Sequence, residues 1–495
     1  MSVMLEGISE ETLEAIKKAQ TAGVLATTGL FGYDLSGPVS LVPVNTPWYE
    51  RIARKTAPQG SDAAYWRAIL NINNTQPSPF VGRDAGGNFI NVKEQDVLAK
   101  YQPVRVSGKV TKDAIRLYKG YADAKAIATT HTLMQWRLQE NKALFGGQNF
   151  ALPATATPTL ADSATGGSIN ANTAVYVKCA ARSAYNYYWG GSNVASSAVT
   201  VTTANDGVNT HKVTATVTAV RGAVAYDWFV SGDDTTYYYL TTTTVNKVVY
   251  SAVISAHQAV PTTIPGLNTT AVTTPPIADT SYSADSYNGL IASLAGSYLD
   301  STGALVTYGT GSSTVSGATI TSLNGATMTA SSQGVTEVDS MLLSIWNAAQ
   351  LSPSAMIMNA QQAQDLSTKV LGSGYALTQL TAADPGRKGI TAGGVVSRYV
   401  NRASGGNEVE ILVDPAFPQG SIAFVTEQVP YPDNMEARTF EARCLEDVTQ
   451  TAYGAALTAG GAGAGPREEW DCSSMETFIN RAPVTCGLLS NIENG

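Results

Sequence analysis

Alternating apolar and polar positions predict antiparallel β-structure in the middle of the chain. Residues 221–250 show the pattern most clearly: an alternating run, a Ser-Gly-Asp-Asp turn and a returning run rich in Tyr and Thr. Similar short runs recur at about 173–182 and 211–220, separated by Gly, Asn and Asp. This spacing predicts a β-sandwich of roughly 110 residues over about 155–265. The expected inward positions are Val175, Val177, Cys179, Ala181, Val213, Ala215, Val217, Ala219, Val224, Tyr226, Trp228 and Val230.

The longest helical pattern lies before this module, at about 111–145. Thr111 is the expected N-cap, and Gly146 with Gly147 ends the helix. Gly120 invites a bend, and Glu140 is the one misfit in an otherwise apolar stripe. The stripe consists of Ile115, Tyr118, Ala122, Ala126, Thr129, Leu133, Trp136 and Ala143.

Shorter helical patterns lie at both ends of the chain. A capped amphipathic helix is predicted at 9–20, and others at 283–296 and 335–350. "SPSAMIMNAQQAQDLSTKVLG" predicts a strand, an Asn359 cap and a helix that stops at Gly372. Several strands follow over 387–460, and a Gly/Ala loop separates them from a last strand in "METFINRAPVTCGLL".

Two segments near the N-terminus predict extended structure with little core of its own. Pro38, Pro43, Pro47 and Pro58 exclude a continuous helix, so an extended arm is expected over about 21–60. Residues 62–106 predict a two-stranded ribbon, "AAYWRAILNIN" and "KYQPVRVSGKV", around a Gly-rich tip. Such a ribbon is only marginally stable alone, and it needs a surface to lie on.

Composition narrows the class of protein. A chain of 495 residues has room for two to four domains, and the net charge of −8 gives no support for nucleic-acid binding through clustered Lys and Arg. The four cysteines form no zinc spacing and are expected to be buried small side chains, with a Cys472–Cys486 disulfide as the alternative. No signal peptide or membrane span is recognisable in the sequence.

The search for a catalytic or metal-binding pattern finds none. His131, His211 and His257 fall in a helix, a strand and a linker, without an expected carboxylate partner. "GGAGAGP" lacks the Lys-Ser/Thr of a phosphate loop, and the Asp233–Asp234 pair is typical of a turn. We therefore predict that the protein is not an enzyme and needs no cofactor or metal.

The order arm, ribbon, long helix and mixed α/β remainder resembles that of the major capsid protein of tailed double-stranded DNA bacteriophages. The run from "ITSLNGATMTASS" through "VTEVDSMLLSIWNAAQ" to "LSPSAMIMNAQQ" is similar to that of many such subunits. The resemblance covers about 1–150 and 280–495. It implies an α+β fold of N-terminal arm, extended loop, spine helix, peripheral domain and axial domain. "VTAVRGAVAYDWFVSGDD" resembles an immunoglobulin-like or fibronectin type III strand pair, so the fold is expected to be interrupted by an all-β sandwich.

The resemblance implies a division of the chain into seven parts. These are 1–61, N-terminal helix and arm; 62–106, extended loop; 107–150, spine helix and start of the peripheral domain; 151–270, inserted sandwich with linkers; 271–350, peripheral domain continued; 351–455, axial domain and return; and 456–495, Gly/Ala loop and C-terminal strand. An insert whose ends lie close together is expected to leave its host undisturbed, so deletion of about 155–270 is expected to leave assembly intact.

The resemblance also implies the partners. Copies would form hexamers and pentamers of an icosahedral shell, assembled in the host bacterial cytoplasm and found in the virion, with the sandwich on the outer surface. A portal, a separate scaffolding protein, a decoration protein and non-specifically contacted double-stranded DNA are further expected partners, and no membrane is involved. Lys93 and Lys100 lie in the ribbon, but no motif assigns a covalent crosslink to them.

Contacts between copies are expected on the arm and the ribbon. The candidates are Trp48, Tyr49, Arg51, Tyr65, Trp66, Phe80, Arg83, Phe89, Lys93 and Tyr101. Three alternatives remain: a tail or baseplate protein, a Thr-rich cell-surface adhesin, and an enzyme with a carbohydrate-binding insert. The first does not need a helix of about 35 residues beside a ribbon. The second predicts a secretion signal, and the third predicts paired carboxylates in a cleft.

Overall fold

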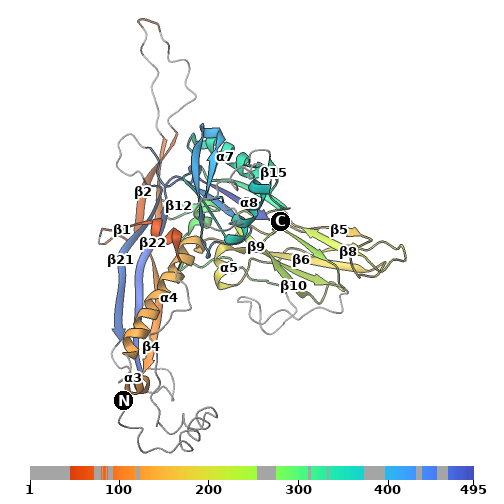
Figure 1. Ribbon diagram of the computed structural model, residues 1–495, viewed down its shortest axis with the longest axis horizontal. Helices are drawn as coiled ribbons and strands as arrows, with labels where there is room; N and C mark the ends of the chain where they lie inside the picture. Colours follow the sequence, from red (N-terminus) through yellow and green to blue (C-terminus); the bar gives the residue numbers. More distant parts are fainter. Residues whose placement is uncertain are drawn as a thin grey trace, which may run out of the picture. The chain divides into compact units, whose positions relative to one another are not determined.

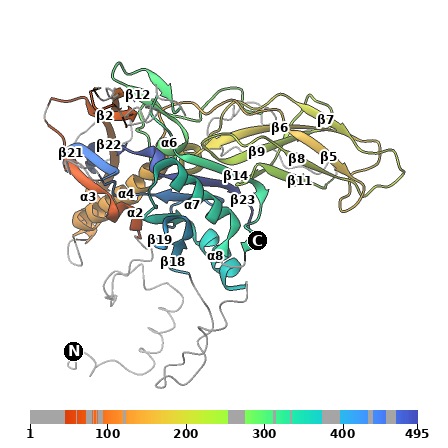
Figure 2. The same cartoon turned by 90° about the horizontal axis from the view of Figure 1, so that it is seen from above.

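The computed structural model describes residues 45–58, 60–71, 80, 82–84, 86, 93–118, 123–252, 275–309, 314–331, 334–372, 396–430, 438–453 and 467–495. All of them belong to one compact unit, Asn45–Gly495. The predicted helix at 9–20, the first part of the arm, Phe89 and most of the Gly/Ala loop lie outside the described residues. Helices and strands are mixed along this unit, so the predicted α+β class is confirmed (Figures 1 and 2).

The end of the predicted arm is not extended. Pro47 opens a short helix, α2 (Pro47–Arg51), where its missing N–H leaves no bond unmade. Strand β1 (Ala53–Thr56) follows and pairs in parallel with β21 (Phe440–Tyr453). The prediction of extended structure is therefore wrong for residues 47–51, which form a helix whose Trp48 packs into this chain's own core, whereas residues 53–56 are extended as a strand.

The ribbon is present, but its second strand is not the predicted one. β2 (Ala63–Asn71) pairs antiparallel with β3 (Lys93–Lys100). β3 also pairs with β12 (Ser297–Asp300), which pairs with β13 (Leu305–Thr307), giving a sheet of order β13-β12-β3-β2. The predicted second flank instead forms β4 (Gln102–Thr111) in another sheet, because its valines pack against the long helix.

A second sheet is built from the longest strands, in the order β1-β21-β22-β4. β22 (Arg467–Asn480) lies between β21 and β4 and is antiparallel to both. Helix α4 (Ala124–Gly146) runs along this sheet, as Figure 1 shows. Its Trp136 packs against Trp470 and Cys472 of β22.

The long helix is described as two helices, α3 (Lys112–Tyr118) and α4, with 119–122 outside the described residues. Thr111 accepts a hydrogen bond from the Ala114 amide at 3.2 Å, and the helix ends at Gly146, both as predicted. The predicted stripe is partly wrong, because Leu133 is 47% exposed. The residues of α4 that are buried are Thr132, Trp136, Glu140, Asn141, Leu144, Phe145 and Gly146.

A third sheet has six strands in the order β14-β23-β20-β17-β19-β18. Their bounds are β14 Thr319–Ala326, β23 Gly487–Ile492, β20 Ile422–Val425, β17 Ala355–Met358, β19 Asn407–Val413 and β18 Arg398–Asn401.

Helices α7 (Thr336–Ala349) and α8 (Ala360–Gly372) pack on one face of this six-stranded sheet. Both were predicted, and the Asn359 carboxamide accepts from the Gln361 amide at 3.3 Å, as expected of the cap. A two-stranded sheet, β15 (Ala330–Ser331) and β16 (Gly334–Val335), precedes α7. "METFINRAPVTCGLL" is not one strand: it is the end of β22, a 3-10 turn at Pro483–Thr485, and β23.

The predicted β-sandwich is formed by two sheets, of order β10-β9-β6-β7 and β11-β8-β5 (Figure 2). They share one core, and the predicted inward residues of β6, β8 and β9 are buried. β9 is buried on both faces rather than one, and a further strand, β5, lies near the start of the module. The strands are β5 Thr159–Ser163, β6 Ala174–Ser183, β7 Val199–Thr202, β8 Lys212–Thr216, β9 Ala223–Ser231, β10 Tyr238–Thr243 and β11 Lys247–Tyr250.

The largest core lies on the other face of the six-stranded sheet and joins the module to its host. It contains the end of α4, helix α6 (Leu290–Ala295) and Trp48. Ala184, at the start of α5 (Ala184–Trp189), and Val224 of β9 are buried in the same core. Two buried side chains of the sandwich thus belong to the core of the rest of the chain.

Two further observations concern the cysteines and the membrane. All four cysteines are buried and free, so the expectation of buried small side chains is confirmed and a Cys472–Cys486 disulfide is absent. Among the described residues, none of the helices has the length and apolar character needed to cross a bilayer.

Candidate interaction surface

The residues predicted on the arm lie mostly inside this chain. Trp48 is 1% exposed, and its ring packs against Phe145 and Phe440 at centroid distances of 6.3 and 5.5 Å. Arg51 Nη2 donates to Glu410 Oε2 at 2.6 Å. The Trp48 side chain is therefore used for packing within the chain, and the Arg51 side chain is partly used for an ion pair within the chain.

A buried ion pair fixes the strand that follows, and it explains the helix misfit. Arg54 of β1 pairs with Glu140 of α4, whose side chain is fully buried, and lies 3.6 Å from Glu476 of β22. The guanidinium also lies over the Tyr49 ring at 5.1 Å. Burial lowers the pKa of Arg54, but attraction to Glu476 and the contact with Tyr49 outweigh it and raise the pKa overall. Burial raises the pKa of Glu476, and Arg54 opposes that shift. These partners come from three distant segments, so no local pattern could reveal them.

The base of the ribbon has one covered and one exposed face. Trp66 is partly buried against Tyr298 and Tyr308, while Tyr65, next to it on β2, is 52% exposed. Alternation along a strand places these neighbours on opposite faces. Tyr101, directly after β3, is buried and packs with Ala64 at the ribbon's end.

Farther along the ribbon the two strands are joined by charge. Arg67 of β2 donates to Asp96 at 2.9 Å and to Glu94 at 3.2 Å across the strand pair. Lys93 is exposed at the end of β3. At the tip, Phe80 is 89% exposed and Arg83 is exposed as well. The predicted contacts between copies at Tyr65, Trp66, Phe80, Arg83 and Lys93 stay predictions.

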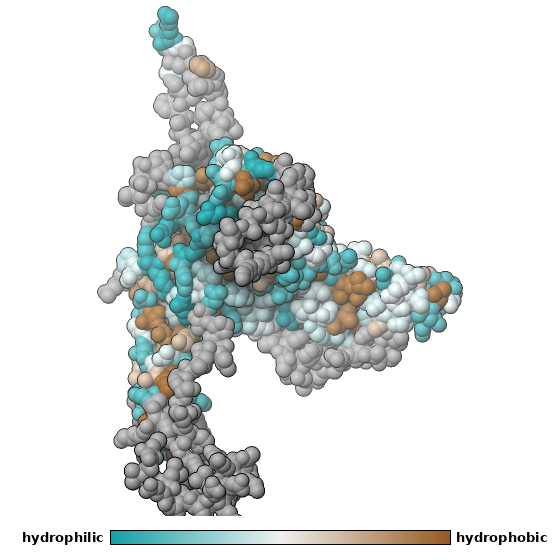
Figure 3. Space-filling view, viewed as in Figure 1, coloured by the Kyte–Doolittle hydropathy of each residue, from teal (hydrophilic) through white to brown (hydrophobic). Residues whose placement is uncertain are grey.

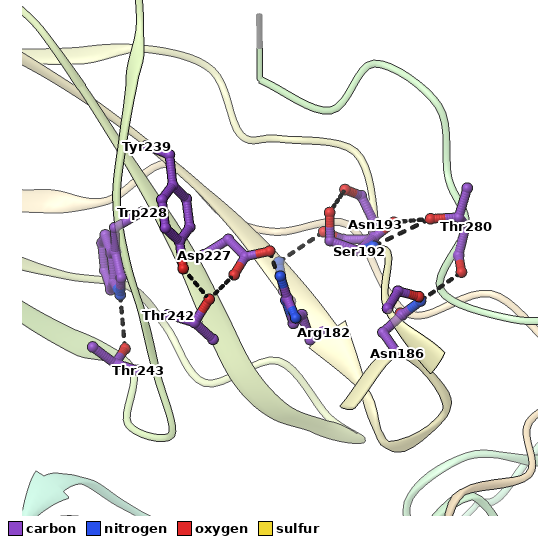
Figure 4. A network of polar contacts seen from close by, with 12 residues as sticks. Arg182, Asn186, Ser192, Asn193, Asp227, Trp228, Tyr239, Thr242, Thr243 and Thr280 are labelled. Carbon is purple, nitrogen blue, oxygen red and sulfur yellow. Dashed lines mark hydrogen bonds and ion pairs between the residues drawn. The ribbon is translucent and has the colours of Figure 1, made fainter. Parts of the chain in front are cut away.

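A polar network holds the two ends of the sandwich module together, and Figure 4 shows part of it. Asn193 Oδ1 accepts from the Ala181 amide at 2.8 Å and from Thr155 at 2.9 Å, and its amide group donates to the Pro153 carbonyl at 3.2 Å. Asn186 donates to the Thr280 carbonyl at 2.7 Å. Residues 153–155 lead into the module and 280 follows it, so both linkers bind one buried Asn/Ser/Thr network.

Next to this network, β9 carries a buried ion pair on its outer side. Arg182 of β6 lies 2.7 Å from Asp227, which also accepts from Thr242 of β10 (Figure 4). Burial raises the pKa of Asp227, and the contact with Arg182 opposes that shift. The pair joins three neighbouring strands across the face that simple alternation assigns to solvent.

Three more hydrogen bonds join the module to its host. Tyr188 donates to the Ala416 carbonyl at 2.6 Å, and Arg221 donates to the Ala295 carbonyl at 2.6 Å. Asn246 donates to Asn324 at 3.1 Å. Together with the shared core, these bonds attach the sandwich to the rest of the chain at several points.

The expectation that none of the histidines has a carboxylate partner is wrong for His211. Its side chain is fully buried, with Nδ1 3.0 Å from Asp162 and Nε2 3.0 Å from Asp206. Because both ring nitrogens face carboxylates, both must carry protons. The hydrogen bond to Asp206 outweighs the effect of burial and raises the pKa of His211. Asp162 lies 49 positions earlier in the sequence, on β5.

The part of the chain that the structure describes bears on the question of a metal site and on the predicted Asp233 turn. There, no group of three His, Cys, Asp or Glu side chains is arranged to hold a metal ion. Asp233 accepts from the Thr235 and Thr236 amides at 2.9 and 2.8 Å, as expected of a turn residue.

The space-filling view adds the distribution of apolar surface. On the face seen in Figure 3, apolar residues form separate spots on the sandwich and on the part of the molecule that contains α4 and β21, and they do not form one continuous patch. On α3 and α4, the exposed apolar side chains are Leu117, Leu133 and Met134. A contact made through the coloured part of this face would therefore be mixed in character rather than broadly apolar.

Comparison with known proteins finds similarity to capsid structures. No family model and no curated protein match the sequence. The capsid of the native GTA particle matches at TM-score 0.43 and 9% identity, covering 95% of this chain and 98% of that one. The cyanophage A-1(L) capsid matches at 0.46 and 9%, covering 94% and 99%. The SrpI encapsulin of Synechococcus elongatus PCC 7942 matches at 0.37 and 8%, covering 95% of each chain.

The chain is thus similar, over almost its full length, to subunits of phage capsids and of one encapsulin. With every TM-score here below 0.5, the likeness is loose. The function is inferred below from contacts within the chain.

Proposed function

We propose that this chain is the major capsid protein of a tailed double-stranded DNA bacteriophage and that its copies assemble into the icosahedral shell around the genome. The observation that carries the proposal is the β2–β3 ribbon. A third strand, β12, supports it only at Val97 and Leu98, near its base. From the Arg67–Asp96 pair outward, the described ribbon has two strands only. A two-stranded ribbon is marginally stable in water, so an assembly that covers it would supply the missing support.

The energetic argument favours many copies over one. Ordering a backbone costs on the order of 1–2 kcal/mol per residue, and the exposed side chains Tyr65, Phe80, Arg83 and Lys93 return little of that within the subunit. An obligate interface of about 2,000–5,000 Å² would supply the burial. In this proposal, residues 62–106 are the extended loop, α3 with α4 is the spine helix, and 351–455 contains the axial domain. Symmetric closure then repeats the contacts in hexamers and pentamers.

The sandwich is proposed as an immunoglobulin-like domain on the outer surface of the shell. Its four-stranded and three-stranded sheets match the strand count of a constant-type immunoglobulin domain. Its attachment through both linkers would hold it at a fixed angle to the shell. A portal, a separate scaffolding protein and a decoration protein are the proposed partners, and the contact with packaged DNA is non-specific. The role is structural, with no catalysis and no cofactor.

Electron microscopy and sedimentation of the purified full chain test the proposal together. We expect closed icosahedral shells, and, in particles made with the other virion proteins, double-stranded DNA that resists nuclease. Tubes would favour a tail protein. Monomers at high concentration, with amides of β2 and β3 protected from hydrogen exchange, would overturn the proposal because the ribbon would then need no second copy.

A further inference from the structure

The sheet that contains the ribbon has an open edge on each side. In its order β13-β12-β3-β2, the described residues place no strand beyond β2 or beyond β13. Backbone N–H and C=O groups along such an edge form a template for a further strand. Natural edges are usually protected by charges or Pro, yet the nine residues of β2, AAYWRAILN, contain one charge and no Pro. Their one irregularity lies at the far end, between Ile69 and Asn71, so the base of β2 is open to pairing.

One face of this sheet carries an apolar row that reaches both edges. The strand register places Tyr65 opposite Leu98, Leu98 opposite Leu299, and Leu299 opposite Leu305. Side chains directly opposite each other in antiparallel strands lie on the same face of the sheet. Leu98 in the middle of the row is buried, but Tyr65 at the β2 edge is 52% exposed and Leu305 at the β13 edge is 53% exposed. The row therefore ends in a half-exposed apolar side chain at each open edge.

A hollow of about 340 Å³ lies beside the β13 end of the row. It is lined by Leu299 and Leu305 from the sheet and by Phe150 and Tyr282 from the segments that lead into and out of the sandwich. Lys100, at the end of β3, lines it as well and is exposed. A hollow with apolar walls and one ammonium group suits a tyrosine side chain, which has an apolar ring and a polar tip.

The number of strands decides how two copies can join these edges. Four antiparallel strands alternate in direction, so β13 runs opposite to β2. The β2 strand of a second copy in the same orientation is therefore antiparallel to β13, and the sheet continues from one copy into the next. Such a head-to-tail contact closes into a ring when the rotation between copies closes. Pairing of β2 with β2, by contrast, needs a two-fold axis and joins only two copies.

We propose that strand β2 of one copy pairs antiparallel with β13 of the next copy and that Tyr65 of the added strand fills the hollow beside Leu305. In this register Tyr65 continues the apolar row, and its hydroxyl can accept a hydrogen bond from Lys100. The occupant is a second copy of this chain, because an open strand edge recognises another strand edge and the apolar row runs on from one edge to the other. The inference rests on the proposed shell function and names the surface that receives the base of the ribbon.

Disulfide trapping in the full chain tests the pairing directly. The double variant Tyr65→Cys/Leu305→Cys places one thiol at each edge. Within one chain these positions are three strand spacings apart, about 14 Å, which no disulfide spans. Across the proposed junction their Cβ atoms are about 5 Å apart. After mild oxidation of assembled particles, we expect most chains to run as a ladder of covalent oligomers on a non-reducing gel. The four native cysteines are buried, so they should not contribute.

The single variants are the matched controls. Leu305→Cys alone and Tyr65→Cys alone should both give no ladder. Covalent dimers of Tyr65→Cys would show pairing of β2 with β2 across a two-fold axis and would overturn the proposal. Closed shells of the double variant without a ladder would also overturn it, while the shell function would stand. Failure of the wild type to assemble would overturn the shell function and this inference together.

A second variant tests the same edge without a crosslink. Leu305→Lys places a charge in the hollow at a half-exposed position, so the subunit should melt like the wild type. The yield of shells should fall about tenfold or more, because loss of an interface anchor weakens a contact by at least that factor. Val249→Lys, at a 49% exposed position on the edge strand β11 of the sandwich, is the matched control and should assemble normally. A normal yield of shells from Leu305→Lys would show that the β13 edge stays open in the assembly and would overturn the proposal.

Discussion

The β-sandwich and the β2–β3 ribbon follow the same period-two alternation, yet only the sandwich closes a core within the chain. In β9 both faces are buried, one by the second sheet and the other by strands and loops of the module. In β2 the same alternation buries the Trp66 face partly and leaves Tyr65 half exposed. Alternation thus shows which side chains share a face, but it does not show what covers that face.

The largest effect on stability is expected when the sandwich is removed. Deleting residues 156–270 takes Ala184 and Val224 out of the host core and breaks the Tyr188–Ala416 hydrogen bond. We expect a loss of about 3–5 kcal/mol and therefore little folded subunit, since a buried Val contributes about 1.5–3 kcal/mol, the lost hydrogen bond about 1 kcal/mol, and the cavity left behind adds to both. Soluble yield and calorimetry measure the effect. A deletion variant that melts like the intact host would show that the two cores are independent.

Its control changes only the far end of the module. Replacing the exposed Val208 with Ser should leave melting of the host unchanged. The expectation from sequence that deletion of about 155–270 is tolerated is thereby revised, because that expectation treats the sandwich as a closed unit joined by linkers only.

The next test concerns the host, where a charge is buried instead of an apolar side chain. Glu140→Ala leaves Arg54 three-quarters buried without its nearest carboxylate, although Glu476 remains 3.6 Å away. We expect a loss of about 2 kcal/mol, below the 3–5 kcal/mol typical of a fully buried pair. Glu50→Ala is the matched control, since its pair with Arg137 is exposed and should contribute about 0.5 kcal/mol or less. Equal losses in urea unfolding would contradict this assignment.

Local patterns reveal some parts of the molecule and not others, and the reason is physical. The caps Thr111 and Asn359 were predictable because a cap acts within three residues of its side chain. The partner of β2 was not, because both 93–100 and 100–110 have strand-like sequences, and the choice depends on α4 packing against β4. Glu140 was visible as a misfit, but its partner Arg54 lies 86 positions away and no spacing rule connects them.

Among the candidate interface residues, too, local sequence predicted exposure correctly at some positions and not at others. Exposure of Tyr65 and Phe80 fits the expectation that the ribbon presents aromatic side chains. Trp48 and Tyr101 were chosen for the same residue type, but each fills a local core, because composition alone does not distinguish an aromatic side chain that packs inward from one that projects. The hollow beside Leu305 carries no sequence signal, since its lining combines residues near 100, 150, 280 and 300.

Within the module, the linker network should matter less than the shared core. Asn193→Ala removes the acceptor of the Ala181 amide and the donor to the Pro153 carbonyl. Leaving these buried groups unpaired should cost about 1–3 kcal/mol. Limited proteolysis should then cut the linker near 153 faster than in Ser197→Ala, a control at an exposed position of the module. Unchanged cleavage would show that the shared core alone holds the module.

The His211 clasp, which consists of His211 and its two carboxylate partners Asp162 and Asp206, makes the stability of the sandwich depend on pH in a defined direction. The pKa of His211 is raised above its ordinary 6.5. Its contribution to the free energy of unfolding is therefore complete below pH 6.5 and is lost as pH rises through the folded-state pKa. The pKa of Asp206 is lowered below 3.8, mainly by the Val208 amide and His211, so its contribution is present above 3.8 and is lost as pH falls through the folded-state pKa. The clasp should therefore be strongest between about pH 3.8 and 6.5.

Calorimetry of the full chain across this range checks the direction. The melting temperature of the full chain should fall as pH rises above 6.5, and His211→Gln should flatten that dependence. His131→Gln, at an exposed position on α4, is the matched control and should leave it unchanged. A transition that rises over the same interval would contradict the arrangement of two carboxylates around a protonated ring.

A substitution on the exposed face of the ribbon should have the smallest effect on the stability of the subunit. It therefore tests most directly whether another copy covers that face. Tyr65→Ser removes a side chain that is half exposed, so the subunit's unfolding free energy should change by about 0.5 kcal/mol or less. If the exposed face of β2 is covered by a second copy, the same change should nevertheless reduce the yield of shells, because an aromatic anchor in an interface contributes about 2 kcal/mol or more. Tyr282→Ser, at a tyrosine that is 40% exposed and outside the ribbon, is the matched control. Loss of assembly with unchanged stability in Tyr65→Ser, and neither change in Tyr282→Ser, would show that the face left open by this chain is closed by another. Normal assembly of Tyr65→Ser would place the contact on a different face.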